Sequence, residues 1–227
     1  MNEQLDLSKY KRLFTFGCSF TSYMWPTWAD VMAKEMPNTE FFNLGKSGSG
    51  NLLISLRVAE ANNRFKFTET DLIMIMYSSY CREDRWVEGD WISCGNIYNN
   101  DIYPRDWVKK FADEKGYLIR DAALIDLTSN YLEMLPCKSV EMLSVPFVRG
   151  AERCDVRTVV PEDLAELYSK TFSKLKPSIF EIELAGKGVD YHGFKDGHPS
   201  TIRYFNYLEK LGISLSTSTK KFAEDST

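Results

Sequence analysis

The segment Asp71–Tyr77, DLIMIMY, is a continuous apolar run of the length of one strand. Such runs are typical of strands that are covered on both faces, as in parallel sheets. Two earlier segments, Arg12–Phe16 and Phe41–Leu44, are also strand-like, and helical patterns follow them over residues 26–36 and 51–63. Alternation of strands and helices favours parallel pairing through crossover helices. We therefore predict an α/β fold, a three-layer α/β/α sandwich with a mostly parallel, flavodoxin-like sheet.

The rest of the chain continues this alternation after one interruption. The apolar periodicity is lost at about residues 82–105, where we expect an insertion with little regular structure. Beyond it we expect helices over residues 106–114, 118–135, 161–175 and 201–211, and a strand over residues 140–148. From about residue 214 the sequence is polar, and we expect a frayed tail. Without an internal repeat or a low-complexity linker, residues 1–227 are interpreted as a single domain.

Charge and composition argue against several classes of function. The net charge is −4 and the basic residues form no stripe, so a nucleic-acid partner is not expected. The apolar stretches are far shorter than the roughly 20 residues that span a bilayer. The N-terminal segment lacks the apolar core of a signal peptide, and we expect a cytoplasmic protein without membrane association. The five cysteines form no CxxC pair, so we expect free thiols and a function without metal or cofactor. The oligomeric state is left open.

Three turns carry polar residues that are suited to chemistry. The first places Ser19 between a strand and a helix, where free amides favour negative charge on the serine oxygen, although a serine there also suits a helix cap. The second, Asn43–Asn51, is glycine-rich, so it is either a ligand-approaching turn or simply a flexible one. The third, Asp190–Ser200, holds the two histidines of the chain, His192 and His198. Ligands of open parallel sheets bind at the carboxyl ends of the strands, so we expect these turns to converge.

A Gly-x-Ser near the N-terminus, an Asn-x-Gly-x-x-Gly turn after the second strand and an Asp…His-Pro near the C-terminus occur in this order. The order resembles that of the SGNH/GDSL hydrolase superfamily and spans the chain from Leu13 to about Leu211. The opening FTFGCSFT resembles a subgroup found in bacteria and phages. The resemblance implies that Ser19 is the nucleophile and His198 the general base. It also implies that the amides of Ser19 and Gly48 form an oxyanion hole.

The third sequence block departs from the pattern of this superfamily. The family has Gly-x-Asn-Asp after the third strand, and its Asn donates to the oxyanion. This chain has Tyr77–Arg82, YSSYCR, at that place. Ser78, Ser79 and Arg82 are the alternatives for the missing donor, and we assign Ser79 to the oxyanion hole. Loss of one such donor costs roughly 100- to 1,000-fold in turnover, so the replacement matters.

The acid also departs from the family pattern. The family places an Asp three residues before the His, whereas Asp196 stands two residues before His198. In an extended loop these two side chains point the same way, so Asp196 is the candidate acid of a triad. A backbone carbonyl is the alternative partner, and Asp190 is a weaker one.

The resemblance implies a serine esterase that removes a short acyl group, such as acetyl, from a glycan or small metabolite. Acyl transfer to a sugar is an alternative reaction, and a non-catalytic carbohydrate-binding module is an alternative class. Arg82, Trp86 and Trp91 are assigned to substrate binding, because flat aromatic faces suit sugars; the alternative is an insertion pinned by its own aromatic rings. Cys18 is a poor nucleophile, because it points opposite to Ser19 if the strand continues, and hence into the core.

Overall fold

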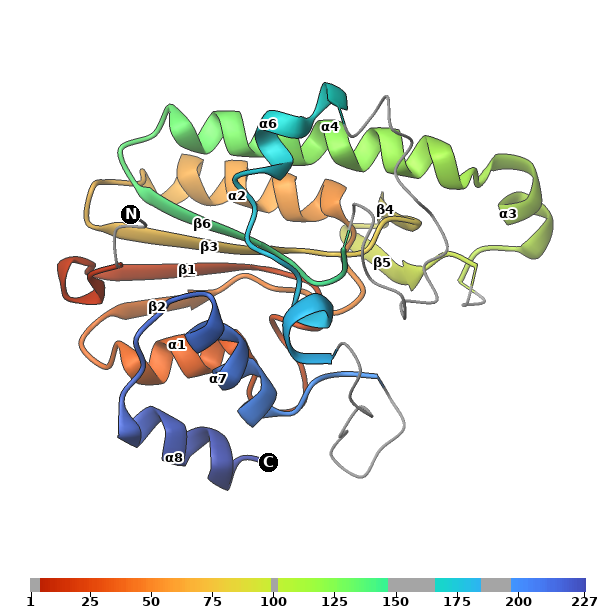
Figure 1. Cartoon of the computed structure of the whole chain (residues 1–227). Helices are drawn as coiled ribbons and strands as arrows, with labels where there is room; N and C mark the ends of the chain where they lie inside the picture. The colour runs from red at the N-terminus through yellow and green to blue at the C-terminus, as the bar shows by residue number, and fades with distance from the viewer. Residues whose placement is uncertain (1–4, 99–101, 147–165, 185–196) are drawn as a thin grey trace.

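Four parallel strands form the central sheet of the protein, whose computed structural model describes residues 5–98, 102–146, 166–184 and 197–227 (Figure 1). The strands are β1 (Arg12–Gly17), β2 (Glu40–Asn43), β3 (Asp71–Tyr77) and β6 (Lys138–Leu143). Their spatial order is β2-β1-β3-β6, and each neighbouring pair is parallel. This arrangement confirms the flavodoxin-like sheet that the sequence predicts.

Helices cover both faces of the sheet, as Figure 1 shows. On one face lie α2 (Asn51–Phe65) and α4 (Glu114–Glu133), and on the other lie α1 (Trp28–Glu35), α7 (Thr201–Lys210) and α8 (Thr217–Asp225). Every residue of β3 is buried, and alternate side chains enter different cores. Ile73 and Ile75 belong to the core with α2 and α4, whereas Met74 and Met76 belong to the core with α1 and α7. The three-layer sandwich is thereby confirmed.

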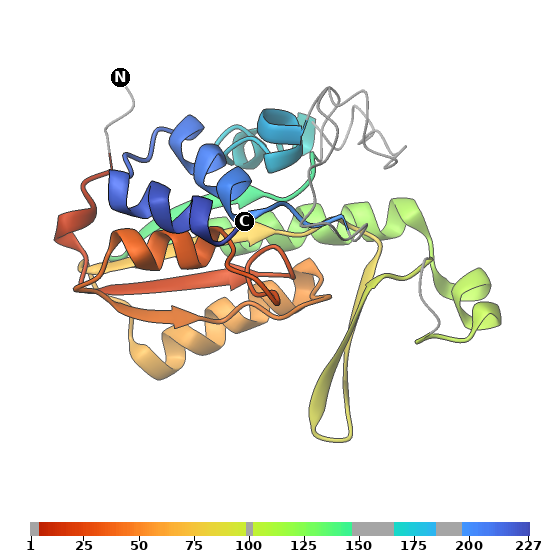
Figure 2. The same cartoon turned by 90° about the horizontal axis from the view of Figure 1, so that it is seen from below.

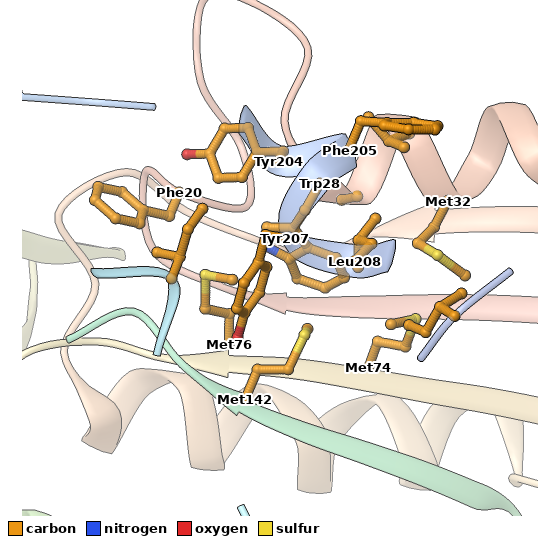
Figure 3. Packing of buried hydrophobic residues seen from close by; sticks show 14 of the residues in the cluster. Phe20, Trp28, Met32, Met74, Met76, Met142, Tyr204, Phe205, Tyr207 and Leu208 are labelled. Carbon is orange, nitrogen blue, oxygen red and sulfur yellow. The ribbon is translucent and has the colours of Figure 1, made fainter. Parts of the chain in front are cut away.

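The core beneath α7 combines thioethers with large aromatic rings (Figure 3). Among its fully buried members are Trp28, Met74, Met76, Met142, Tyr204 and Tyr207. Methionine side chains adapt to the irregular gaps between rings. The polar atom of Trp28 is satisfied as well, because its Nε1 donates to Thr21 Oγ1 at 3.2 Å. This packing fixes the position of α7, the helix that begins shortly after His198.

The segment that was expected to lack regular structure contains a β-hairpin, so that expectation is wrong. Strands β4 (Arg82–Val87) and β5 (Asp90–Asn96) are antiparallel and pair Trp86 with Trp91. Glu88 and Gly89 connect them as a two-residue turn, with φ of 50° and 92°. Turns with positive φ at both central residues match the twist of a hairpin, which explains the local order. Figure 2 shows the hairpin extending away from the central sheet.

The polar segment after residue 214 is ordered as α8, so the expectation of a frayed tail is also wrong. Ser216 caps this helix by accepting from the Thr219 amide at 3.3 Å. Both the amide and the hydroxyl of Ser216 donate to Glu35 of α1 at 2.8 Å. Thr219 and Ala223 lie four positions apart and are fully buried, so one face of this short polar helix packs against the core.

The remaining described elements are short. They are η1 (Leu7–Lys9), α3 (Arg105–Phe111), α6 (Ser169–Phe172) and η2 (Phe180–Leu184). Strand β6 ends at Leu143, and residues 147–148 of the predicted strand lie outside the described residues. The first five residues of the helix that was predicted over 161–175 also lie outside them.

Candidate active site

Ser19 lies in the turn that follows β1, at the carboxyl edge of the sheet. The amides of Thr21 and Ser22 donate to the Cys18 carbonyl at 2.9 Å and 3.1 Å, which closes the turn tightly. Ser19 is 7% exposed, whereas Cys18 is 1% exposed and belongs to the core with α1 and α7. The prediction that Cys18 points into the core is therefore confirmed, and Ser19 is the residue of this turn that faces the site.

His198 reaches Ser19 from the other end of the chain. Its Nε2 lies 2.7 Å from Ser19 Oγ, a hydrogen bond between residues that are 179 positions apart in sequence. Two hydrogen bonds hold the residues that follow His198 against the segment that precedes α1. Trp25 Nε1 donates to the Pro199 carbonyl at 3.0 Å, and Thr201 Oγ1 donates to the Pro26 carbonyl at 2.8 Å. The structure thus brings together the two residues that the sequence motifs pair.

Aromatic rings surround the His198 imidazole. Tyr23 stacks on it with a centroid distance of 3.9 Å and an interplanar angle of 14°. Phe20 and Trp25 approach with their rings steeply inclined, at 5.3 Å and 6.3 Å. Sequence reasoning missed this enclosure, although three aromatic residues within six positions of Ser19 were a usable signal. The three rings restrict the orientation of the imidazole by contact.

The glycine-rich turn lies against the Ser19 turn. The amide of Lys46 donates to the Gly17 carbonyl at 3.0 Å. The side chain of Asn43 joins the two turns, because its Nδ2 donates to the Thr21 carbonyl at 2.9 Å while its Oδ1 accepts from the Gly45 amide. Gly48, the predicted oxyanion residue, follows with a φ of 81°, a conformation that favours glycine.

The residues that replace the third family block are bound into their own network. Ser78 is fully buried, and its amide donates to Asn51 Oδ1 at 2.8 Å while its carbonyl accepts from Asn51 Nδ2 at 3.0 Å. Arg82 donates through Nε to Ser79 Oγ at 3.1 Å and through Nη1 to the Ser49 carbonyl at 3.0 Å. Because the Ser79 hydroxyl accepts this bond, its own proton is directed elsewhere. The assignment of Ser79 to the oxyanion hole stays a proposal.

Two buried carboxylates that the sequence did not point to stand behind these turns. Burial raises the pKa of Asp121 to about 6, against the opposing effect of Arg120. Asp121 accepts from Asn51 Nδ2 at 3.0 Å and from Arg120 Nε at 2.7 Å. Burial also raises the pKa of Asp84 above its ordinary value, and bonds from the amides of Gly50 and Leu53 act in the opposite direction. Asp84 and Asp121 belong to none of the sequence motifs described above.

The residues that were predicted to bind substrate lie on the β4–β5 hairpin. Trp86 is 60% exposed, and its ring meets that of Trp91 across the hairpin at 5.7 Å. The Trp91 carbonyl accepts from Lys46 Nζ at 2.6 Å, so β5 adjoins the glycine-rich turn through its backbone. The role of both indoles and of Arg82 in substrate binding stays a proposal. Asp190, His192 and Asp196 lie outside the described residues.

The described residues lack two kinds of feature. Within residues 5–98, 102–146, 166–184 and 197–227, no group of three His, Cys, Asp or Glu side chains is arranged to hold a metal ion. None of the helices described over the same ranges has the length and apolar character needed to cross a membrane.

Comparisons with known proteins place this geometry in context. No protein-family model matches the sequence, and no curated protein matches it. Among solved structures, a catalytic mutant of Axe2, an acetylxylan esterase from Geobacillus stearothermophilus, is similar at a TM-score of 0.54 and 14% identity, over 90% of this chain and 95% of that chain. A putative lipolytic protein of the G-D-S-L family from Desulfitobacterium hafniense is similar at a TM-score of 0.50 and 14% identity, over 88% of this chain and 99% of that chain. The chain therefore has the fold of the SGNH/GDSL hydrolases.

Proposed function

We propose that this protein is a serine ester hydrolase of the SGNH/GDSL type, with Ser19 as nucleophile and His198 as general base. The observation that carries the proposal is the 2.7 Å contact between Ser19 Oγ and His198 Nε2. A nucleophile within hydrogen-bond distance of a base is the arrangement that activates serine for acyl transfer. The fold that is shared with an acetylxylan esterase agrees with this chemistry.

The reaction follows from the positions of these groups. His198 Nε2 accepts the Ser19 proton as Ser19 Oγ attacks the ester carbonyl carbon, and the negative charge passes to the carbonyl oxygen. Amides of Ser19 and Gly48, with the hydroxyl of Ser79, donate to that oxyanion. The imidazolium then returns its proton to the leaving alcohol, which leaves the acyl group on Ser19. Water, deprotonated by His198, releases the acid and restores the serine.

We infer that the acyl group is short, such as acetyl, and that the alcohol is a glycan or a small metabolite. Phe20, Tyr23 and Trp25 crowd the His198 side of the site, which leaves little room there for a long chain. Trp86 and Trp91 offer aromatic faces on the hairpin, and Arg82 lies at its base. Aromatic faces of this kind suit the apolar faces of sugar rings.

Labelling with a fluorophosphonate tests this function without knowledge of the substrate. We expect the wild-type protein to gain one phosphonyl adduct, which peptide mass spectrometry places on Ser19. The Ser19→Ala variant should not be labelled and should not hydrolyse p-nitrophenyl acetate. The Cys18→Ala variant is the matched control, because it removes the neighbouring nucleophile and should keep both properties. Full activity in the Ser19 variant would contradict the mechanism.

The acid is tested separately. We propose that Asp196 orients His198, and then Asp196→Asn should lower kcat strongly while the substrate KM changes little. If a backbone carbonyl orients the imidazole instead, the same variant should keep most of its activity.

A non-catalytic binding module is the second candidate function. It is favoured by one observation, namely that Arg82 donates to the Ser79 hydroxyl and to the Ser49 carbonyl at the place where the family has its third oxyanion donor. Absence of fluorophosphonate labelling, together with binding of acetylated xylo-oligosaccharides in calorimetry, would support this candidate over the esterase.

A further inference from the structure

The β4–β5 hairpin holds the turn that carries Gly48 through backbone contacts. The amide of Gly95 donates to the Gly48 carbonyl at 3.0 Å. Arg82 Nη1 donates to the next carbonyl, that of Ser49, at 3.0 Å. Lys46 Nζ donates to the Trp91 carbonyl at 2.6 Å from the other side of the turn. The hairpin extends away from the central sheet (Figure 2), and its contacts with the turn run from Arg82 and Gly95 at its base to Trp91 near its tip.

Asp84 of the hairpin provides the most buried of the contacts. This residue is 4% exposed, and its carboxylate accepts from the Gly50 amide at 2.9 Å and 3.1 Å and from the Leu53 amide at 3.0 Å. Ser93 Oγ donates to it at 3.2 Å. Gly50 is the N-cap residue of α2 and has no side chain with which to cap it. The carboxylate of Asp84 therefore supplies, from another strand, the acceptor that a Ser or Asp at the cap position would normally supply.

The two glycines of the turn fit closely against the hairpin. A Cβ at Gly50 would lie 2.8 Å from Asp84 Oδ2, and a Cβ at Gly48 would lie 2.6 Å from the Ser93 carbonyl oxygen. Both distances are shorter than real Cβ contacts, so glycine is required for the hairpin to dock at this depth. The turn and the hairpin thus form one packed unit.

We propose that Asp84 is a positioning residue for the oxyanion hole, because it fixes the turn that aims the Gly48 amide. The proposal rests on the esterase function above. Gly95 holds the carbonyl of Gly48, and Asp84 holds the amide of Gly50, so the chain is anchored on both sides of Ser49. The hairpin follows directly on the segment that lacks the family's Asn donor. The insertion thereby strengthens the placement of the remaining amide donors.

The test is a steady-state and labelling comparison of Asp84→Asn with the wild-type protein. The Asn side chain keeps the shape of Asp but has no charge and replaces one acceptor oxygen with an amide nitrogen. If its oxygen takes the place of Oδ2, the bonds from Gly50 and Ser93 to Oδ1 are lost, and if it takes the place of Oδ1, the bonds from Gly50 and Leu53 to Oδ2 are lost. A misplacement of about 1 Å costs about 100-fold in rate, and we expect kcat for p-nitrophenyl acetate to fall about 10- to 100-fold. KM should change less than about threefold and the midpoint of the acid limb of the pH–rate profile should not move, because the ground-state contacts and His198 are untouched.

Glu88→Gln is the matched control, since it removes a carboxylate from the exposed tip of the same hairpin and should leave kcat unchanged. Hydrogen exchange followed by mass spectrometry should show faster exchange over residues 45–55 in Asp84→Asn only. Unchanged kcat in a variant whose turn exchanges faster would overturn the proposal, and so would unchanged exchange. An inactive wild-type protein would instead refute the esterase function, and the exchange comparison would then decide on its own whether Asp84 orders the turn.

Discussion

Removal of the Tyr23 ring should weaken His198 as a base. The two rings are nearly parallel at a centroid distance of 3.9 Å, so the π face of Tyr23 covers one face of the imidazole. When His198 accepts the Ser19 proton, the resulting imidazolium lies against this negative face. An attraction between a cation and an aromatic ring contributes about 0.5–1 kcal/mol at exposed sites and about 2 kcal/mol when desolvated. His198 is half-buried, between these two cases, so we use the whole interval from about 0.5 to about 2 kcal/mol for the attraction.

The magnitude for Tyr23→Leu follows from this interval. With 1.36 kcal/mol per factor of ten, we expect kcat/KM on the pH plateau to fall about 2- to 30-fold. The same loss should move the acid limb of the pH–rate profile by about 0.4–1.5 pH units towards lower pH, because the charged form of the base is less stable. Both effects come from one interaction, so they should agree in size.

The assay is kcat/KM for p-nitrophenyl acetate from about pH 5 to about pH 9, the interval in which histidine titrates. Tyr23→Phe is the matched control, since it keeps the aromatic face and should stay within about twofold of the wild-type protein on both measures. If Tyr23→Leu lost activity without any movement of the acid limb, the ring would act on the substrate and the reasoning above would be refuted.

Three further predictions concern the scaffold of the site. Asp71→Asn should lower the free energy of unfolding by up to about 3 kcal/mol in urea titrations, because Asp71 is fully buried and Arg12 binds both of its oxygens; a loss below about 0.5 kcal/mol would contradict this. Asp121 has its pKa raised to about 6 from 3.8, so the folded state keeps a proton that the unfolded state releases, and the contribution of this group to stability should fall by about 2 kcal/mol as pH rises from about 4 to about 6. Asp121→Asn should lack this part of the pH dependence, and equal slopes for variant and wild type would refute the assignment. Gly48→Ala should reduce activity more than about 100-fold, since its Cβ would lie 2.6 Å from the Ser93 carbonyl oxygen at a φ of 81°; near-normal kcat would show that this turn does not serve the oxyanion.

The order of the central sheet and the contact of Ser19 with His198 could be predicted, because the strands and the motifs that carry these two residues are recognisable in the sequence. The apolar run of Asp71–Tyr77 gave the bounds of β3, and parallel order followed from the alternation of elements. The pairing of Ser19 with His198 across 179 positions followed from the motif order that resembles the SGNH/GDSL superfamily.

The hairpin was missed because its strands carry many polar residues and lack the apolar alternation of a half-buried strand, although most of β5 is partly buried. The usable signal was the two-residue Glu88-Gly89 turn between Trp86 and Trp91. The contacts of Asp84 with Gly50 could not be predicted, because they join residues 34 positions apart without any periodic pattern. A carboxylate that caps a helix from another strand is a tertiary feature, and local sequence rules describe only caps that stand beside their helix.

The order of the chain has a consequence for how activity arises during folding. Ser19, the glycine-rich turn and three of the four strands of the central sheet lie within the first 77 residues, whereas His198 precedes α7 near the other end. A partly synthesised chain can therefore pair β1, β2 and β3 while its serine still lacks a base. In the folded protein α7 packs against α1 with its Tyr204 and Tyr207 in the core, and this packing holds the segment that carries His198 beside Ser19. On the proposed mechanism, such a chain has no base for its serine until its C-terminal third has packed, so recovery of esterase activity during refolding would report the docking of α7.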